Sequence, residues 1–322
     1  MTFNPYPLKF KPLFQERVWG GREIERFGYD LPPGKIGEGW MIADHPSGIS
    51  HIANGELAGL GLDEVRKRFG HKWLGKKGQS RHGRFPLLIK LLDCNENLSV
   101  QVHPNDEYKN LPVGELGKTE MWYIVDAKPE SKIIFGLKPE IDCTLLREAV
   151  EKGYVMDTLQ VVNVQKGDCF YIPAGTVHAL CAGVLVAEIQ QNSDTTYRLY
   201  DYNRPGLDGK PRVLHVEDSL NVITYDFSEA RHIPTLDMKV NKWIKLVESP
   251  YFLTEKGTIE GSMVVHTSED SCDIIIVVEG AGSIAWANGE VSARAGDCFV
   301  IPANLGEYEM TGNLTVLRSR IL

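Results

Sequence analysis

The chain has 322 residues, with 35 lysines and arginines, 43 aspartates and glutamates, and a net charge of −8. This length suits two domains, and an acidic balance without a basic block argues against nucleic acid or an anionic membrane as the main partner. The N-terminal stretch lacks an apolar signal core, no apolar run approaches the ~18 residues of a membrane span, and the six scattered cysteines form no C-x-x-C pair. We therefore expect a cytoplasmic protein that acts on a small molecule.

The first third of the chain predicts short strands and one helix. Residues 1–57 are extended pieces broken by glycine and proline, whereas residues 62–74 have an acidic start and helical apolar spacing. The apolar run 85–92 predicts a strand that carries one charged residue, Lys90. Two interpretations stay open for Lys90. It is either an edge-strand lysine whose amine reaches water, or a neighbour of a phosphate or metal site.

The stretch Leu98-Ser99-Val100-Gln101-Val102-His103-Pro104-Asn105-Asp106 places polar side chains in an otherwise apolar strand. Residues two apart share a strand face, so Ser99, Gln101 and His103 point the same way. Inside a closed β-structure an unpaired amide or imidazole would cost about 1–3 kcal/mol. We therefore expect a metal ion or a ligand to be their partner.

Two further segments bring metal-ligating residues toward this strand. Glu120 precedes the apolar run 121–125, and His178 follows an aromatic strand that stops at Pro173 and a glycine turn. Two imidazoles and a carboxylate, with a neutral amide nearby, form a set that Zn²⁺ accepts with one position left open. The pattern predicts a catalytic metal site.

The remaining elements predict further strands and two short helices. Residues 142–152 have helical spacing after Asp142, a suitable N-cap, and residues 215–223 form a second helix candidate. Residues 195–202 alternate as a strand that includes Arg198, and residues 227–234 have the composition of a linker.

An internal repeat indicates two similar halves. Residues 167–174 recur at 296–303 with seven of eight positions identical, and the apolar run 122–125 recurs weakly at 274–277. In this alignment Cys272 takes the place of Glu120, and Glu307 takes the place of His178. We therefore expect the metal chemistry in the first half, and a C-terminal half that has no metal of its own and covers the catalytic one.

The segment from Gly167 to His178 resembles the second signature of the cupin superfamily, whose members are double-stranded β-helix barrels with an interior metal. The first signature, His-x-His followed three or four residues later by Glu, is partly met, because Gln101 replaces its first histidine. Literal spacing selects Glu107. We prefer Glu120, because Pro104-Asn105-Asp106 is a turn sequence that leads the chain out of the strand.

A narrower resemblance is to the type I mannose-6-phosphate isomerases in their short bacterial form. The matching pieces are Trp19-Gly20-Gly21, Glu38-Gly39-Trp40-Met41, His45-Pro46-Ser47, Leu98 to Asp106, Gly117-Lys118-Thr119-Glu120, Pro173 to His178, and Arg198. The resemblance implies a mainly β fold of two cupin-like jelly-roll halves with a few short helices. Residues 1–234 would form the catalytic metal-binding domain, and residues 235–322 a cupin-like domain without metal ligands.

The same resemblance implies an aldose–ketose isomerase that interconverts mannose 6-phosphate and fructose 6-phosphate through an enediol. One Zn²⁺ per chain would be held by His103, Glu120, His178 and Gln101, although whether Gln101 is a direct ligand stays open. Arg198 and Lys118 would be catalytic, and Ser99, Lys90 and Trp19 would bind substrate. From its place two residues before Glu120, Lys118 is our candidate proton shuttle, with Glu188 as the alternative.

Two other functions remain as alternatives. A cupin iron oxygenase would favour more imidazole ligands and has no reason to direct Lys90, Lys118 and Arg198 into one cavity. A non-catalytic sugar-binding cupin fits the second half better than the first. We expect a monomer or a weak homo-oligomer.

Overall fold

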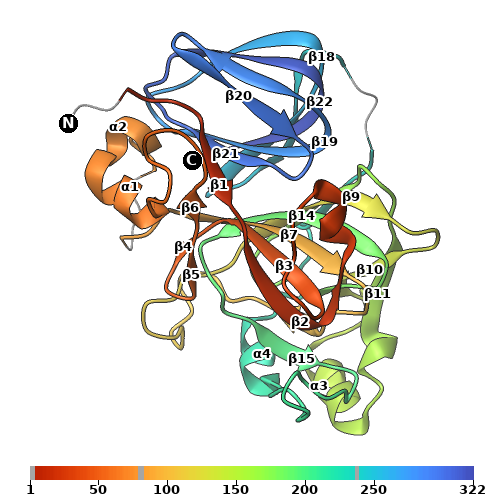
Figure 1. The fold of residues 1–322 in the computed structure, drawn as a ribbon. Helices are drawn as coiled ribbons and strands as arrows, with labels where there is room; N and C mark the ends of the chain where they lie inside the picture. The colour runs from red at the N-terminus through yellow and green to blue at the C-terminus, as the bar shows by residue number, and fades with distance from the viewer. Residues whose placement is uncertain (1–3, 79–82, 236–238) are drawn as a thin grey trace.

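The first half of the molecule consists of two facing sheets, whose strands alternate apolar and polar side chains (Figure 1). The computed structural model describes residues 4–78, 83–235 and 239–322. The larger sheet has the order β16 (Arg231–Ile233), β12 (Cys169–Ile172), β9 (Glu120–Ala127), β14 (Val184–Gln191), β7 (Leu87–Cys94), β2 (Leu13–Gly21) and β3 (Ile36–Ile42). The smaller sheet has the order β11 (Leu159–Asn163), β10 (Lys132–Leu137), β13 (His178–Leu180), β8 (Val100–Val102) and β15 (Tyr197–Tyr200).

The second half is one eight-stranded sheet dominated by three long strands. Its order is β17 (Trp243–Glu248), β18 (Phe252–His266), β22 (Glu307–Ile321), β19 (Asp273–Trp286), β21 (Cys298–Ile301), β1 (Leu8–Lys11) and β6 (His51–Ile52), with β20 (Gly289–Arg294) paired to β19. The N-terminal strand β1 thus pairs with β21 across the two halves, which Figure 1 shows as a red segment beside the blue domain. We therefore propose that residues 235–322 form a second domain whose sheet is extended by β1 and β6.

The helices confirm the sequence predictions with small changes. The first predicted helix is divided into α1 (Leu62–Phe69) and α2 (His71–Leu74), because Gly70 between them has a positive φ of 52°. The other helices are α3 (Cys143–Lys152) and α4 (Val216–Val222), and Asp142 accepts a hydrogen bond from the Leu145 amide as the N-cap of α3. Short pieces complete the fold: β4 (Asp44–His45), β5 (Gly48–Ile49), and the 3₁₀ turns η1 (Glu23–Phe27) and η2 (Val155–Thr158). None of the helices in the described ranges is long and apolar enough to cross a membrane.

The expected linker at residues 227–234 is partly wrong. Its last residues form β16, which pairs with β12 as an edge strand of the larger sheet. Backbone hydrogen bonds to a free sheet edge therefore override a composition that is typical of a loop. The expected domain boundary falls directly after this strand and next to residues 236–238, which lie outside the described ranges.

A shared apolar core joins the two halves. Alternate residues of β7, such as Ile89 and Leu91, point away from the first barrel and pack in one cluster with Phe252, Ile274 and Ile276 of the second half. The opposite face of β7 looks into the first barrel, whose own core includes Leu92. The C-terminal half thus covers the back of the larger sheet, as expected.

The structure corrects the alignment of the repeat. Glu120 pairs with Ile172, and the residue that pairs with the corresponding Ile301 is Asp273. Asp273, not Cys272, therefore occupies the position of Glu120. The error is one residue, because the short apolar runs of β9 and β19 align almost equally well in either register.

We expect Phe252→Ala to destabilise the protein by about 3–5 kcal/mol, the usual cost of emptying a large aromatic site in a core. Phe252 is fully buried between the two halves. Val264→Ala is the control, since this side chain on β18 is about half exposed and should change stability by less than about 0.5 kcal/mol. Urea unfolding followed by tryptophan fluorescence measures both, and equal midpoints for the two variants would contradict the role of the interface.

Candidate metal centre

Strand register places three polar side chains in a row on the inner face of the smaller sheet. Gln101 on β8 is directly opposite His178 on β13 and Arg198 on β15. Directly opposed residues of antiparallel strands share a face. The row therefore points into the barrel, while the neighbouring Val100 and Val102 pack outward with the apolar residues near α3 and α4.

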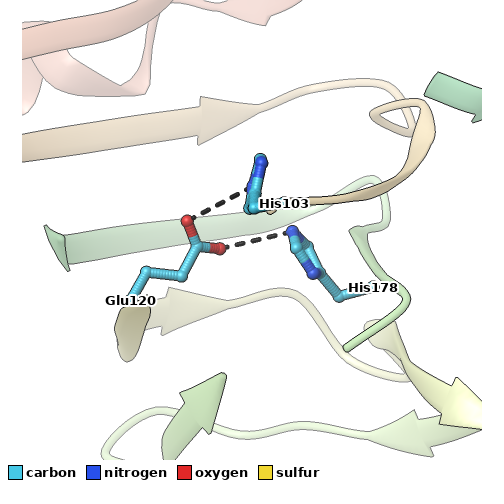
Figure 2. A group of neighbouring side chains, drawn as sticks. All are labelled: His103, Glu120 and His178. Carbon is cyan, nitrogen blue, oxygen red and sulfur yellow. Dashed lines mark ion pairs between the residues drawn. The ribbon is translucent and has the colours of Figure 1, made fainter. Parts of the chain in front are cut away.

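The metal-ligand candidates meet where this row faces the larger sheet. Glu120 begins β9, and His103 directly follows β8. Figure 2 shows the Glu120 carboxylate facing both imidazoles, with one oxygen directed to each ring. Oε2 lies 3.5 Å from Nε2 of His103, and Oε1 lies 3.3 Å from Nε2 of His178. Within the described ranges, these three form the one group of histidine, cysteine and acidic side chains whose ligand atoms lie within 4.8 Å of one another.

Backbone carbonyl groups orient both imidazoles for metal binding. Nδ1 of His103 lies 2.9 Å from the Thr195 carbonyl oxygen, and Nδ1 of His178 lies 2.9 Å from that of Thr176. With Nδ1–H donating to these carbonyl groups, each Nε2 keeps its lone pair toward Glu120. Burial lowers the pKa of His178 to about 3 and that of His103 well below its usual range, so both rings are neutral.

The Glu120 carboxylate makes no hydrogen bond to the described residues, although Lys118 lies within ion-pair distance of it. Both its oxygens are buried, and among the described residues neither has a hydrogen-bond partner. Burial raises the pKa of Glu120 to about 7, because the charged form is poorly solvated. A carboxylate and two imidazole lone pairs that point at one another are all acceptors, so the donor set fits a divalent cation such as Zn²⁺.

Gln101 and Glu107 lie differently with respect to this group. The Gln101 amide donates to Nε2 of His178 at 3.3 Å, and a half-turn of the amide would present its oxygen there instead. A fourth ligand at Gln101 therefore stays a prediction. Glu107 is exposed in the turn after β8, where its N–H donates to the Asn105 side chain.

Lys118 lies against the metal-ligand candidates. Its Nζ is 3.2 Å from Nε2 of His103 and 3.3 Å from Oε2 of Glu120. The backbone holds it there, because the Lys118 N–H donates to the Pro104 carbonyl and the preceding Gly117 N–H donates to the Asp106 carboxylate. The turn after β8 thus fixes the position of Lys118, two residues before β9 begins.

A cavity of about 470 Å³ lies beside the metal-ligand candidates, because Gln101 and Lys118, which contact them, are part of its wall. The wall also includes the residues that the sequence suggested for substrate and catalysis, namely Trp19, Lys90, Ser99, Lys118, Glu188 and Arg198. This volume lies within the range of small-molecule sites. Arg17 and Glu38 also line the cavity, and neither was predicted to have a role. Glu38 could have been found from the sequence, because it is a lone glutamate between two glycines in the fully buried strand β3.

The edge-strand interpretation of Lys90 is wrong. Lys90 is buried in the central strand β7, with its Nζ 3.7 Å from Glu38 and 3.5 Å from Glu188. Burial lowers its pKa, but the two carboxylates outweigh that effect and raise it overall. Lys90 is therefore a fixed positive charge in the cavity wall.

Arg198 is a cation of the cavity wall that has no carboxylate partner among the described residues. Among the described residues no carboxylate lies within ion-pair distance of its guanidinium group, and its buried Nε has no hydrogen-bond partner. Burial lowers its pKa, but an arginine stays charged. The arrangement leaves Arg198 available for an anion in the cavity.

The sequence and the fold are similar to those of known enzymes. Residues 8–137 match the family profile "Phosphomannose isomerase type I, catalytic domain", and residues 242–321 match "Mannose-6-phosphate isomerase, cupin domain". The chain is 41% identical to the mannose-6-phosphate isomerase ManA of Bacillus subtilis over 95% of this chain and 96% of that protein. It is 36% identical to the mannose-6-phosphate isomerase of Streptococcus mutans over 97% and 98% of the two chains.

Solved structures agree with this similarity. The crystal structure of the mannose 6-phosphate isomerase from Bacillus subtilis superposes with a TM-score of 0.83 at 35% identity, over 97% of this chain and 99% of that one. A putative mannosephosphate isomerase from Archaeoglobus fulgidus superposes with a TM-score of 0.77 at 19% identity, over 100% and 99% of the two chains, and supports the fold alone.

We expect His103→Ala and His178→Ala each to abolish stoichiometric binding of a first-row divalent ion, because each removes one of the three ligand candidates. Glu107→Ala is the control and should keep the metal, since Glu107 lies in an exposed turn. Elemental analysis of the purified variants measures this. Loss of metal from the Glu107 variant alone would mean that the wrong carboxylate has been chosen.

We also expect metal binding to release most of one proton near pH ~6 and little near pH ~8. The pKa of Glu120 is about 7, whereas that of His178 is about 3, so at the lower pH the carboxyl group carries the proton that the metal displaces. Because binding releases protons, affinity should rise with pH across this interval. Calorimetric titrations in two buffers of different ionisation enthalpy measure the release, and a release that grows toward alkaline pH would contradict the assignment.

Proposed function

Because this chain belongs to the type I phosphomannose isomerase family, we propose that it interconverts mannose 6-phosphate and fructose 6-phosphate through an enediol. Family membership makes the chain a sugar-phosphate isomerase, and the metal and the residue roles are the proposal. One observation supports it: a buried carboxylate without hydrogen bonds faces two neutral imidazoles next to a cavity whose wall includes Lys118 and other cations.

We assign one Zn²⁺ per chain to His103, Glu120 and His178, with Gln101 as the candidate fourth ligand. When bound, the ion would supply Lewis acidity that stabilises negative charge on the substrate's carbonyl oxygen. The neutral state of both imidazoles supports this assignment, because only the unprotonated ring binds a metal.

Lys118 is our candidate for moving the proton between C1 and C2 of the sugar. Its amine lies at the edge of the metal-ligand group and also in the cavity wall, so it borders both the metal and the substrate. Glu188, a buried carboxylate in the same wall, is the alternative base. Either group would act by general acid–base catalysis, which needs a positioned side chain within hydrogen-bond reach.

Arg198 is our candidate for the contact with negative charge. Its planar guanidinium group can bind a phosphate or a developing oxyanion with two hydrogen bonds. Lys90 and Ser99 line the same cavity and would bind the phosphate or hydroxyl groups of the sugar, and Trp19 would give an apolar wall. A buried lysine held between two carboxylates is suited to binding because it keeps its charge and its place.

The alternatives have less support. A cupin iron oxygenase or a non-catalytic sugar-binding cupin gives no reason for a cavity wall with Lys90, Lys118 and Arg198, and the family similarity favours neither. The preference for zinc over other divalent ions, the cytoplasmic location and a monomeric or weakly oligomeric state stay predictions.

We expect purified protein to isomerise mannose 6-phosphate, to lose activity with a chelator, and to regain it with Zn²⁺.

Arg198→Ala should lower kcat by at least ~10²-fold, the usual scale for a charged transition-state contact, and should leave the metal in place. Lys118→Ala should also lower kcat and shift the basic limb of the pH profile. Steady-state kinetics with metal analysis measures both variants. If Arg198→Ala raises only KM, Arg198 binds the phosphate group, and the catalytic role is assigned to Lys118 or Glu188 instead.

A further inference from the structure

Four side chains form a transverse row on the cavity face of the larger sheet. Trp40 on β3 is opposite Lys90 on β7, Lys90 is opposite Glu188 on β14, and Glu188 is opposite Trp122 on β9. Both tryptophans are almost completely buried. The row therefore encloses the Lys90–Glu188 ion pair between two indole rings.

Each indole donates a hydrogen bond to a carboxylate beside Lys90. Nε1 of Trp40 lies 2.7 Å from Oε2 of Glu38, and Nε1 of Trp122 lies 3.0 Å from Oε2 of Glu188. The two carboxylates differ in their other partners. Arg17 donates to both oxygens of Glu38, whereas among the described residues Trp122 is the one hydrogen-bond donor to Glu188.

The orientation of Glu188 therefore depends on Trp122. The other oxygen of Glu188, Oε1, is buried without a hydrogen bond and lies 3.5 Å from Nζ of Lys90 in the cavity wall. A buried carboxylate oxygen that accepts nothing from the protein is free to accept from a substrate. The indole itself is held on its other side, because its ring packs edge-on against His178 with centroids 5.3 Å apart.

We propose that Trp122 is a positioning residue that acts through Glu188 in the isomerisation. Its N–H fixes one oxygen of the carboxylate, so that Oε1 faces the substrate beside Lys90 and accepts a hydrogen bond from a substrate hydroxyl in the chemical step. This inference rests on the proposed function, because it needs an isomerase reaction in this cavity.

The test compares Trp122→Phe with Trp40→Phe in the zinc-loaded full-length enzyme. Trp122→Phe should lower kcat ~10-fold or more, part of the ~10²–10⁴ that a positioned acid–base group supplies, with KM within about threefold of the wild-type value and full zinc content. Trp40→Phe removes an equivalent indole donor from Glu38, which Arg17 still holds. It should change kcat by less than about threefold. Equal losses in the two variants would overturn the proposal.

A double-mutant cycle separates positioning from general damage to the core. If Trp122 acts through Glu188, the variant with both Trp122→Phe and Glu188→Gln should have the kcat of Glu188→Gln alone. Losses that multiply would mean that Trp122 acts independently of the carboxylate, and the proposal would fail.

A closer analogue guards against misfolding of Trp122→Phe. Site-specific incorporation of 3-benzothienylalanine at position 122 keeps the bicyclic shape and replaces the N–H with sulfur. It should reproduce the loss of kcat with full zinc content, and wild-type kcat in this variant would overturn the inference. An inactive zinc-loaded wild-type enzyme would instead refute the proposed function, so the two failures are distinct.

Discussion

The constraint on which the first barrel depends is the burial of the Glu120 carboxylate. A carboxylate removed from water without a partner costs several kcal/mol, and the protein gives this one no hydrogen bond among the described residues. The neighbouring imidazoles do not relieve the cost, because their N–H groups already donate to backbone carbonyl groups. The Lys118 ammonium group, 3.3 Å from Oε2, offsets part of this cost, and a metal cation held by Glu120 and both imidazoles would lower it further.

The second barrel shows the same position without that constraint. Asp273 occupies the place of Glu120, but the Tyr308 hydroxyl donates a hydrogen bond to it at 2.8 Å. Tyr308 directly follows Glu307, the residue that takes the place of His178 in the repeat. A phenol brings its own proton and an imidazole with a bare Nε2 does not, so Asp273 has a hydrogen-bond donor where Glu120 has none among the described residues.

Local patterns allowed much of this fold and site to be predicted from the sequence. The N-cap of α3, the polar residues in the strand at residues 98–103 and the turn sequence from Gly167 to His178 each depend on neighbours within about ten positions, which a sequence displays directly. Lys90 could not be placed that way. Whether β7 is an edge or a central strand depends on pairing with β14 and β3, which come from distant parts of the chain. The one-residue error in the repeat alignment, which put Cys272 in the place of Asp273, has the same origin, because register is set by pairing across strands.

The order of the charged side chains across the larger sheet explains which groups of the cavity wall are left to bind a substrate. Arg17, Glu38, Lys90 and Glu188 alternate in sign as neighbours, so each of the two inner groups, Glu38 and Lys90, lies within 4 Å of two groups of opposite charge. Glu188 ends this series, and the charge that would follow it is absent from the described residues of the wall. Arg198, on the facing sheet, has a positive charge without a carboxylate partner. The cavity therefore lies between a carboxylate oxygen with no donor and a guanidinium group with no acceptor. A phosphorylated sugar, with hydroxyl donors and an anionic group, supplies both.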